Sequence, residues 1–181
     1  LDEKLSFSFE MKSGTYNCLI WADYIDANAS LLDAGGNAET TRYADKYFDT
    51  SDLTAVSMKN PLELVNNDVC DAFFYSGEMQ KNDGKGLAME ISLMRPFSKI
   101  SIREENQREF NLLKELKAIF PVATTFNVAT GMVAGTPVQQ EHHVTDFKPE
   151  VMAERTLLSF YTFANSETQK LGGVSLTFTT G

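Results

Sequence analysis

The 181-residue sequence is short of the residue types on which many functional sites depend. It has two cysteines, two histidines and one tryptophan. Cys18 and Cys70 do not form a CxxC pair, which excludes a zinc ribbon and a thioredoxin-like motif. The sequence also has no P-loop, GxGxxG, GxSxG or HExxH motif. These absences argue against the common nucleotide-binding, hydrolase and zinc-protease classes, and we expect no cofactor.

Basic residues are also scarce. Lys and Arg together number 16, against 25 Asp and Glu, which gives a net charge of −9. A surface of this sign does not displace counterions from nucleic acid and is repelled by anionic membranes, so neither is an expected partner. The longest apolar runs cover only a few residues, such as 18–22, and are too short to span a bilayer. With 43% hydrophobic residues, the chain predicts one folded globular domain.

The two ends and the cysteines leave questions open. The chain starts at Leu1 with no initiator Met and no apolar leader, and a β-like segment runs almost to Gly181. We therefore expect a trimmed leader or a fragment of something longer. Cys18 and Cys70 lie in apolar surroundings, which is typical of buried free thiols. A disulfide between them in an oxidising compartment is the alternative.

Alternation of apolar and polar residues predicts that the chain is mostly β-strand. Leu5, Phe7, Phe9 and Met11 share one parity, which is typical of a half-buried strand. The denser apolar run over 16–24 indicates a central strand covered on both faces. Further strands are expected over 53–58, 72–75, 122–128, 157–163 and 174–178, the last two as a hairpin.

Two stretches carry special signals. Within 87–103 the apolar residues change parity around Pro96, which indicates one long bent strand or two strands on different sheets. One helix is predicted near 107–119, because Asn106 followed by Glu109 resembles a capping box. Its apolar stripe, which Pro121 ends, consists of Phe110, Leu113, Leu116 and Phe120. About seven or eight strands with one inserted helix favour an all-β antiparallel β-sandwich in a single domain, 1–181.

No set of residues for catalysis stands out, so we do not expect an enzyme. His142 and His143 are adjacent, in a polar stretch expected to be a loop. Neighbouring side chains of an extended chain point to opposite sides, so the two histidines suit one metal ion badly. Asp45, Asp49 and Asp52 lack the spacing of an EF-hand and its closing Glu. We therefore predict no metal site.

The polar, turn-rich segment 26–52 is predicted to be a long loop, and long loops in compact domains are often functional. Tyr43, Tyr47 and Phe48 are its candidate ligand contacts. They suit one alternative function, a monomeric surface module that binds carbohydrate or protein. The competing explanation is a solvated loop whose aromatic side chains fold back onto the core.

Five short segments carry a resemblance to a known family. They are Tyr16–Tyr24 (YNCLIWADY), Asp52–Val56 (DLTAV), Asp71–Tyr75 (DAFFY), Leu93–Ile100 (LMRPFSKI) and Phe126–Gly131 (FNVATG). In this order they resemble the fimbrillin-like proteins of Bacteroidetes, the superfamily of type V pilins and related cell-surface lipoproteins, and within it an uncharacterised branch. The resemblance implies a transthyretin-like β-sandwich. It also implies that residues 1–181 are the N-terminal domain of a longer protein.

The resemblance further implies a function. It points to a non-enzymatic fimbrial or fimbria-associated subunit, exported by a lipoprotein signal and displayed on the outer membrane. Its partners would be other fimbrial subunits or a second copy, joined by donor-strand exchange, with host glycans or proteins as further candidates. Membrane contact would come only through the removed, lipid-anchored leader. Leu5, Phe7, Phe9 and Met11 are the candidate exchangeable segment, and a permanently paired strand is the competing interpretation.

Overall fold

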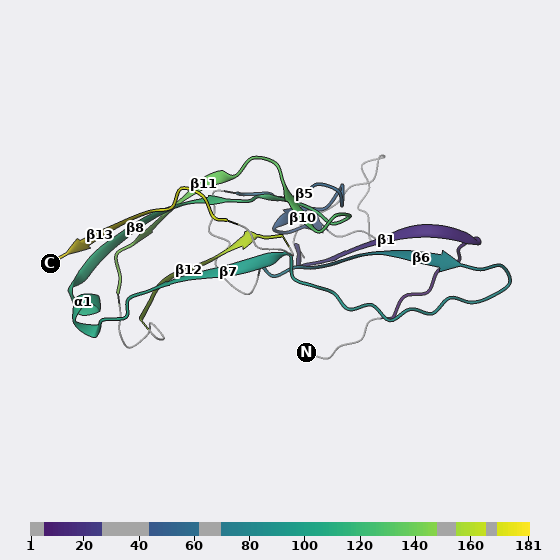
Figure 1. The fold of residues 1–181 in the computed structure, drawn as a ribbon, viewed down its shortest axis with the longest axis horizontal. Coiled ribbons are helices and arrows are strands. Elements are labelled where there is room, and N and C mark those ends of the chain that lie inside the picture. The colour runs from purple at the N-terminus through teal and green to yellow at the C-terminus, as the bar shows by residue number, and fades with distance from the viewer. Residues whose placement is uncertain (1–5, 27–43, 62–69, 148–154, 166–169) are drawn as a thin grey trace.

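The structure is a computed structural model that describes residues 6–26, 44–61, 70–147, 155–165 and 170–181. The chain is elongated and consists mainly of antiparallel strands (Figure 1). A two-stranded arm, formed by β1 (Gly14–Ala22) and β6 (Phe73–Lys81), makes one end of the molecule. The α-helix of the described residues, α1 (Gln107–Leu112), lies at the opposite end with the last strand, β13 (Ser175–Thr180).

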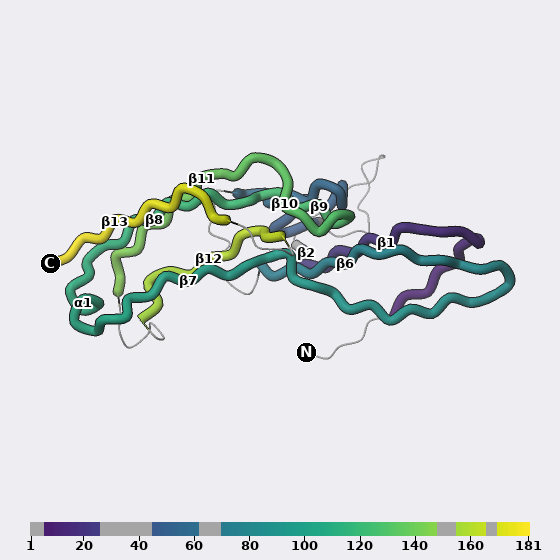
Figure 2. Tube along the Cα trace, viewed as in Figure 1, coloured from purple at the N-terminus to yellow at the C-terminus, as the bar shows by residue number. Residues whose placement is uncertain are grey.

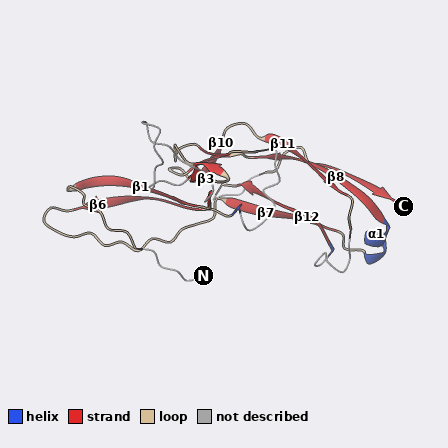
Figure 3. Ribbon diagram, turned by 180° about the vertical axis from the view of Figure 1, so that it is seen from behind, coloured by secondary structure: helices blue, strands red, loops and turns tan. Residues whose placement is uncertain are grey.

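The other strands run between these two ends, as the colouring by secondary structure shows (Figure 3). They are β2 (Ile25–Asp26), β3 (Ala44–Asp45), β4 (Phe48–Asp49), β5 (Val56–Met58), β7 (Phe97–Arg103), β8 (Leu113–Val122), β9 (Thr125–Asn127), β10 (Met132–Ala134), β11 (Val138–Val144) and β12 (Thr156–Phe163).

The sheets join strands from distant parts of the chain. β8 lies between β11 and β13 in a three-stranded sheet, and β12 pairs with β7 in a two-stranded sheet. The Cα trace shows these as two separate layers (Figure 2). A four-stranded sheet has the order β10-β9-β5-β4, and β2 pairs with β3. The predicted all-β, antiparallel, sandwich-like fold is confirmed.

The first hydrophobic cluster fills the space between the two layers. Every second residue of β8 from Leu116 to Val122 is buried, so these side chains share one face. Opposite them lies β12, whose Phe160 ring is 4.2 Å from the Phe120 ring, measured between centroids. Burying a side chain of this size stabilises the fold by roughly 1.5–3 kcal/mol. The two layers are therefore held together chiefly by apolar contacts.

The second cluster lies where β4, β6, β7, β9 and β12 meet, close to the base of the arm. The Phe163 ring stacks on Phe97 at 4.7 Å between centroids and also contacts Phe126 at 5.6 Å. Phe48 meets Phe163 at 5.8 Å and the Trp21 ring, from β1, at 5.5 Å. Aromatic pairs at these distances add to simple area burial. Trp21 thereby fixes the arm to the body.

The predicted helix near 107–119 is too long. Asn106 caps its start as expected: its side-chain oxygen accepts hydrogen bonds from the backbone N–H groups of Arg108 and Glu109, at 2.9 and 3.4 Å. The helix ends at Leu112, however, and Leu113 is already extended. β8 has a partner strand on each side, and burial along it has a period of two residues. The apolar residues of the predicted stripe that lie in β8 therefore follow the spacing of a strand and not that of a helix.

Pro121 does not end a helix but lies near the end of β8, opposite Gln139 of β11. The pairing of β8 with β13 begins at Ile119 and continues away from Pro121. The proline therefore lies where β8 has a strand neighbour on one side, a position at which a missing N–H is tolerated.

Two predictions for the N-terminal part are wrong. Residues 6–12, which include Phe7, Phe9 and Met11, form no strand in the structure. The run 16–24 was expected to be a central strand, but β1 pairs only with β6 among the described residues, and its apolar side chains are half-buried. Its many apolar residues lie on the two faces of the arm, each of which is only partly covered, and not in the middle of a sheet.

Other corrections concern pairing. Residues 87–93 lie outside the strands, and Met94 makes an isolated bridge to Phe74. The two histidines lie in β11 and not in a loop. The sequence did not indicate this strand, because polar residues occupy its inner face and mask the usual alternation of apolar and polar residues. The last two strands form no hairpin, since β12 pairs with β7 and β13 with β8.

Candidate functional site

The N-terminal segment exposes its aromatic side chains. Phe7 is 82% and Phe9 is 68% exposed, and the backbone of described residues 6–12 pairs with no strand. Met11 is half-buried, and the carbonyl of Lys12 accepts a hydrogen bond from the Tyr16 hydroxyl at 2.9 Å. Leu5 lies outside the described residues. The structure therefore does not place Phe7 and Phe9 in a permanently paired strand.

A second exposed apolar feature is β13, an edge strand of the three-stranded sheet. Leu176 pairs with Ala118 and Phe178 with Leu116, so their side chains point to the face that forms the core. They nevertheless stay 41% and 46% exposed, and all six residues of β13 are exposed. Within the described chain, the facing layer has two strands against three, which leaves this part of the inner face uncovered.

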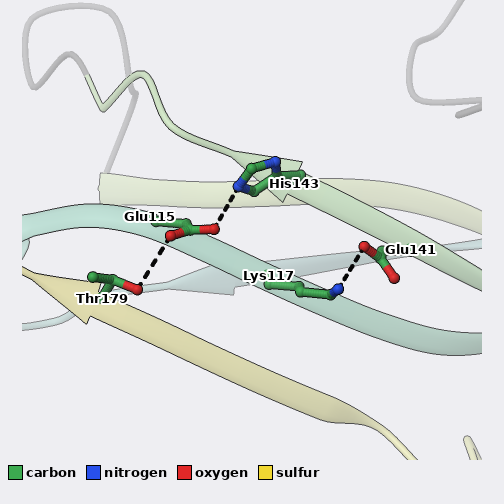
Figure 4. Close-up of polar contacts among 5 residues, drawn as sticks. All are labelled: Glu115, Lys117, Glu141, His143 and Thr179. Atoms are coloured by element: carbon green, nitrogen blue, oxygen red, sulfur yellow. Dashed lines mark hydrogen bonds and ion pairs between the residues drawn. The ribbon is translucent and has the colours of Figure 1, made fainter.

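The outer face of the same sheet is polar (Figure 4). Glu115 of β8 connects both neighbouring strands: His143 Nε2 lies 2.6 Å from its Oε1, and the Thr179 hydroxyl donates to its Oε2 at 3.3 Å. Lys117 pairs with Glu141 at 2.8 Å. Exposed pairs of this kind contribute about 0–1 kcal/mol each. They favour the register in which β8 pairs with its two neighbouring strands.

His142 points the other way, into the core, and is 1% exposed. Its ring lies 5.5 Å from Phe120 and 5.4 Å from Phe160, and neither ring nitrogen has a hydrogen-bond partner among the described residues. Burial lowers the pKa of His142, which keeps the ring neutral. The opposite directions predicted for His142 and His143 are confirmed. Among the described residues no three His, Cys, Asp or Glu side chains converge as metal ligands would.

Asp45, Asp49 and Asp52, the three aspartates compared above with a calcium loop, accept hydrogen bonds from residues close to them in the sequence. Asp45 accepts hydrogen bonds from the backbone and hydroxyl of Thr50, at 2.7 and 2.9 Å. Asp49 and Asp52 do the same for Ser51 and Thr54, and these hydrogen bonds lower the pKa values of both carboxyls. Each carboxylate therefore stabilises a local turn.

The residues predicted to bind a ligand in 26–52 are divided by the structure. Phe48 is fully buried in the second cluster, so its assignment as a surface contact is wrong. Tyr47 is half-buried against the same cluster, and Tyr43 lies outside the described residues. Phe48 is buried because rings from distant strands close over it, which its polar neighbours in the sequence gave no sign of.

Both cysteines are free thiols in the structure. Cys70 is buried, and this burial raises the pKa of its thiol, although a hydrogen bond with Tyr47 opposes the shift. Cys18 is half-buried on β1 opposite Gly77. A neutral, buried Cys70 behaves as a small apolar side chain.

The fold and its exposed edges define an all-β protein whose unusual surfaces are strand edges and an unpaired N-terminal segment. The chain belongs to the DUF6562 family, a family of unknown function, whose sequence profile matches residues 1–181. No curated protein and no solved structure matches it. The one α-helix of the described residues is too short to cross a membrane.

Proposed function

We propose that this protein is a non-enzymatic structural or adhesive subunit of a cell-surface fimbrium, or a fimbria-associated lipoprotein, that assembles by β-strand exchange. The observation that carries the proposal is the exposure of Phe7 and Phe9 on a segment outside the sheets. Covering apolar surface is worth roughly 25 cal/mol per Å². Two aromatic side chains of one parity therefore favour docking of this segment onto a partner.

β13 is the edge that suits such a segment best. Its outer edge has no strand partner among the described residues and so offers backbone groups for pairing, and the strand contains no charged residue that would oppose a neighbour. An added strand with Phe7 and Phe9 on its inner face would continue the exposed apolar row of Leu176 and Phe178. Backbone hydrogen bonds would supply affinity, and the alternating side chains would supply register.

The resemblance to fimbrillin-like proteins supports the cellular setting of this proposal. Under it, the protein is exported with a lipid-anchored leader, displayed on the outer membrane, and continues beyond residue 181 into a second domain. Its partners are other subunits or a second copy, and host glycans or proteins are the targets of adhesion.

Deletion of residues 1–12 tests the exchange. We expect the parent chain to form filaments in negative-stain electron microscopy, or oligomers that survive heating in detergent, and the deletion to abolish them. Assembly that is unchanged by the deletion, or a parent chain that stays monomeric at high concentration, would contradict the proposal.

A matched pair of substitutions separates side-chain docking from a general effect of the tail. Phe7→Ser with Phe9→Ser removes the apolar parity, whereas Ser6→Thr with Ser8→Thr changes the other parity and keeps the aromatics. We expect the first pair to lose assembly and the second to retain it. On the acceptor side, Leu176→Glu should weaken assembly more than Thr177→Glu, whose side chain points to the outer face.

A further inference from the structure

We infer that residues 87–93 form a strap that closes on the open edge of β6 and becomes a third strand of the arm. At the base of the arm, Phe74 and Met94 exchange two backbone hydrogen bonds: each N–H donates to the other's carbonyl oxygen, at 2.8 and 2.9 Å. Beyond this bridge the chain bows away from β6 and meets it again only at the tip (Figure 2). The bridge is the first rung of a ladder that the structure leaves unformed.

The register of the closed state follows from this bridge. Antiparallel pairing from Phe74 and Met94 sets Tyr75 opposite Leu93, and Met79 opposite Met89. Because Phe74 directs its N–H and C=O toward Met94, the alternate residues of β6 direct theirs to the same edge. These residues, Ser76, Glu78 and Gln80, have no strand partner on that edge within the described chain.

The side chains of strap and arm match in this register. One face of the arm is largely apolar and carries Tyr16, Cys18 and Ile20 from β1 with Tyr75 and Met79 from β6. The strap would add its apolar residues to this face. They are Leu87, Met89, Ile91 and Leu93, of which Leu87, Met89 and Leu93 are 41%, 42% and 38% exposed in the open form. A slip of one residue would direct all of them to the other face, so the register is well specified.

Both ends of the strap already have a geometry that is compatible with closure. The turn 82–86 has the length of a five-residue hairpin loop, and Gly84 holds the positive φ of 64° that such loops need. At the base, the Arg95 guanidinium donates from Nε to Asp71 at 2.8 Å and lies over the Phe73 ring. Closure would move the backbone between these two ends.

The closed form also contains an unfavourable pair of charges, which opposes closure of the strap. It places Glu78 directly opposite Glu90 in a hydrogen-bonded pair, and like charges at such positions are destabilising. Removing this repulsion favours the closed form. Closure covers the open edge of β6, so the strap decides whether the arm offers an edge to an extended segment of another molecule.

Disulfide trapping tests the register in the monomer, independently of assembly. In a Cys18→Ala, Cys70→Ala background, Met79→Cys with Met89→Cys creates a directly opposed, non-hydrogen-bonded pair, whose Cα atoms lie about 4.5 Å apart on closure. Met79→Cys with Leu87→Cys is the control, because a diagonal pair is about 7–8 Å apart and does not bridge readily. Circular dichroism first verifies that both variants are folded.

We expect mild oxidation to form an intramolecular disulfide several-fold faster in the opposed pair than in the diagonal pair. Equal rates, a faster diagonal pair, no bridge in either, or a disulfide between two molecules would overturn the proposal. Loss of residues 1–12 should leave the result unchanged, which separates it from the function proposed above.

The charge on residue 90 provides the second arm of the test. Glu90→Lys converts the opposed pair into an attractive one and should increase the rate of bridging and the hydrogen-exchange protection of the Ser76, Glu78 and Gln80 amides. Glu105→Lys, an equal charge change next to α1, should alter neither quantity. If both substitutions act alike, net charge alone explains the effect and the assigned register is wrong.

Discussion

His142 and His143 are neighbours in β11 that lie on opposite faces of its sheet. The first is 1% exposed and packs against both Phe120 and Phe160, whereas the second pairs with Glu115 at the surface (Figure 4). Burial without a hydrogen-bond partner penalises the charged form of His142 and lowers its pKa. Protonation of His142 therefore disfavours the folded core, whereas His143 contributes a polar contact on the outer face.

The substitution His142→Phe should flatten the pH dependence of stability. With a lowered pKa in the folded state, the unfolded chain binds more protons as the pH falls toward and below the ordinary histidine value of about 6.5. The free energy of unfolding of the parent protein should therefore fall from about pH 7.5 to about pH 5.5. Phenylalanine keeps the aromatic packing without a titrating group, and urea unfolding across this range measures the slope.

The lowered pKa values of Asp49 and Asp52 place their contribution below about pH 4, outside this range. If the parent and His142→Phe have the same slope, His142 is not the group responsible.

Alanine at Phe163 should be far more damaging than alanine at Phe178. Phe163 is fully buried and contacts Phe97, Phe126 and Phe48, so its truncation leaves a cavity and should cost about 3–5 kcal/mol in free energy of unfolding. Phe178 is 46% exposed, and its truncation should cost about 1 kcal/mol or less. Denaturant unfolding of the two variants gives the comparison, and similar losses would show that β13 is packed more tightly than described.

Local pattern predicted most strands but could not decide between the helix and β8. Leu113, Leu116 and Phe120 fit a helical stripe, while Leu116 and Phe120 also fit the alternation that continues to Val122. The strand forms because β11 and β13, distant in sequence, pair on both of its sides. Such non-local pairing is not visible in a short window, so only the capped first turns of the predicted helix are helical.

The same limit applies to the candidate sites. The parity of Phe7 and Phe9 was evident from the sequence, but whether a partner strand covers them depends on residues elsewhere in the chain. Phe48 had polar neighbours that indicated a loop, yet Trp21 and Phe163 bury it from other strands. The exposed row on β13 had a weak signal, a terminal strand with no charged residue.

Removal of the helix cap should weaken the α1 end of the molecule. Asn106→Ala leaves the N–H groups of Arg108 and Glu109 without their side-chain acceptor and should cost about 1 kcal/mol. Asn106→Ser keeps an acceptor and should restore most of the loss. Thermal unfolding of the three proteins checks this, and an equal loss in both variants would indicate that packing, rather than the cap, is affected.

Serine at both Phe7 and Phe9 should leave the isolated subunit as stable as the parent. Phe7 and Phe9 are 82% and 68% exposed, so removal of their rings takes away little packing on the body. We therefore expect the melting temperature of dilute monomer to change by less than about 2 °C. The half-buried Met11 provides the contrast, since Met11→Ser should lower it more. A fall of more than about 4 °C in the double variant would mean that the aromatics pack against their own subunit. The N-terminal segment would then not be free to dock onto another subunit. A loss of assembly in the double variant would in that case reflect a destabilised subunit and not a loss of strand exchange.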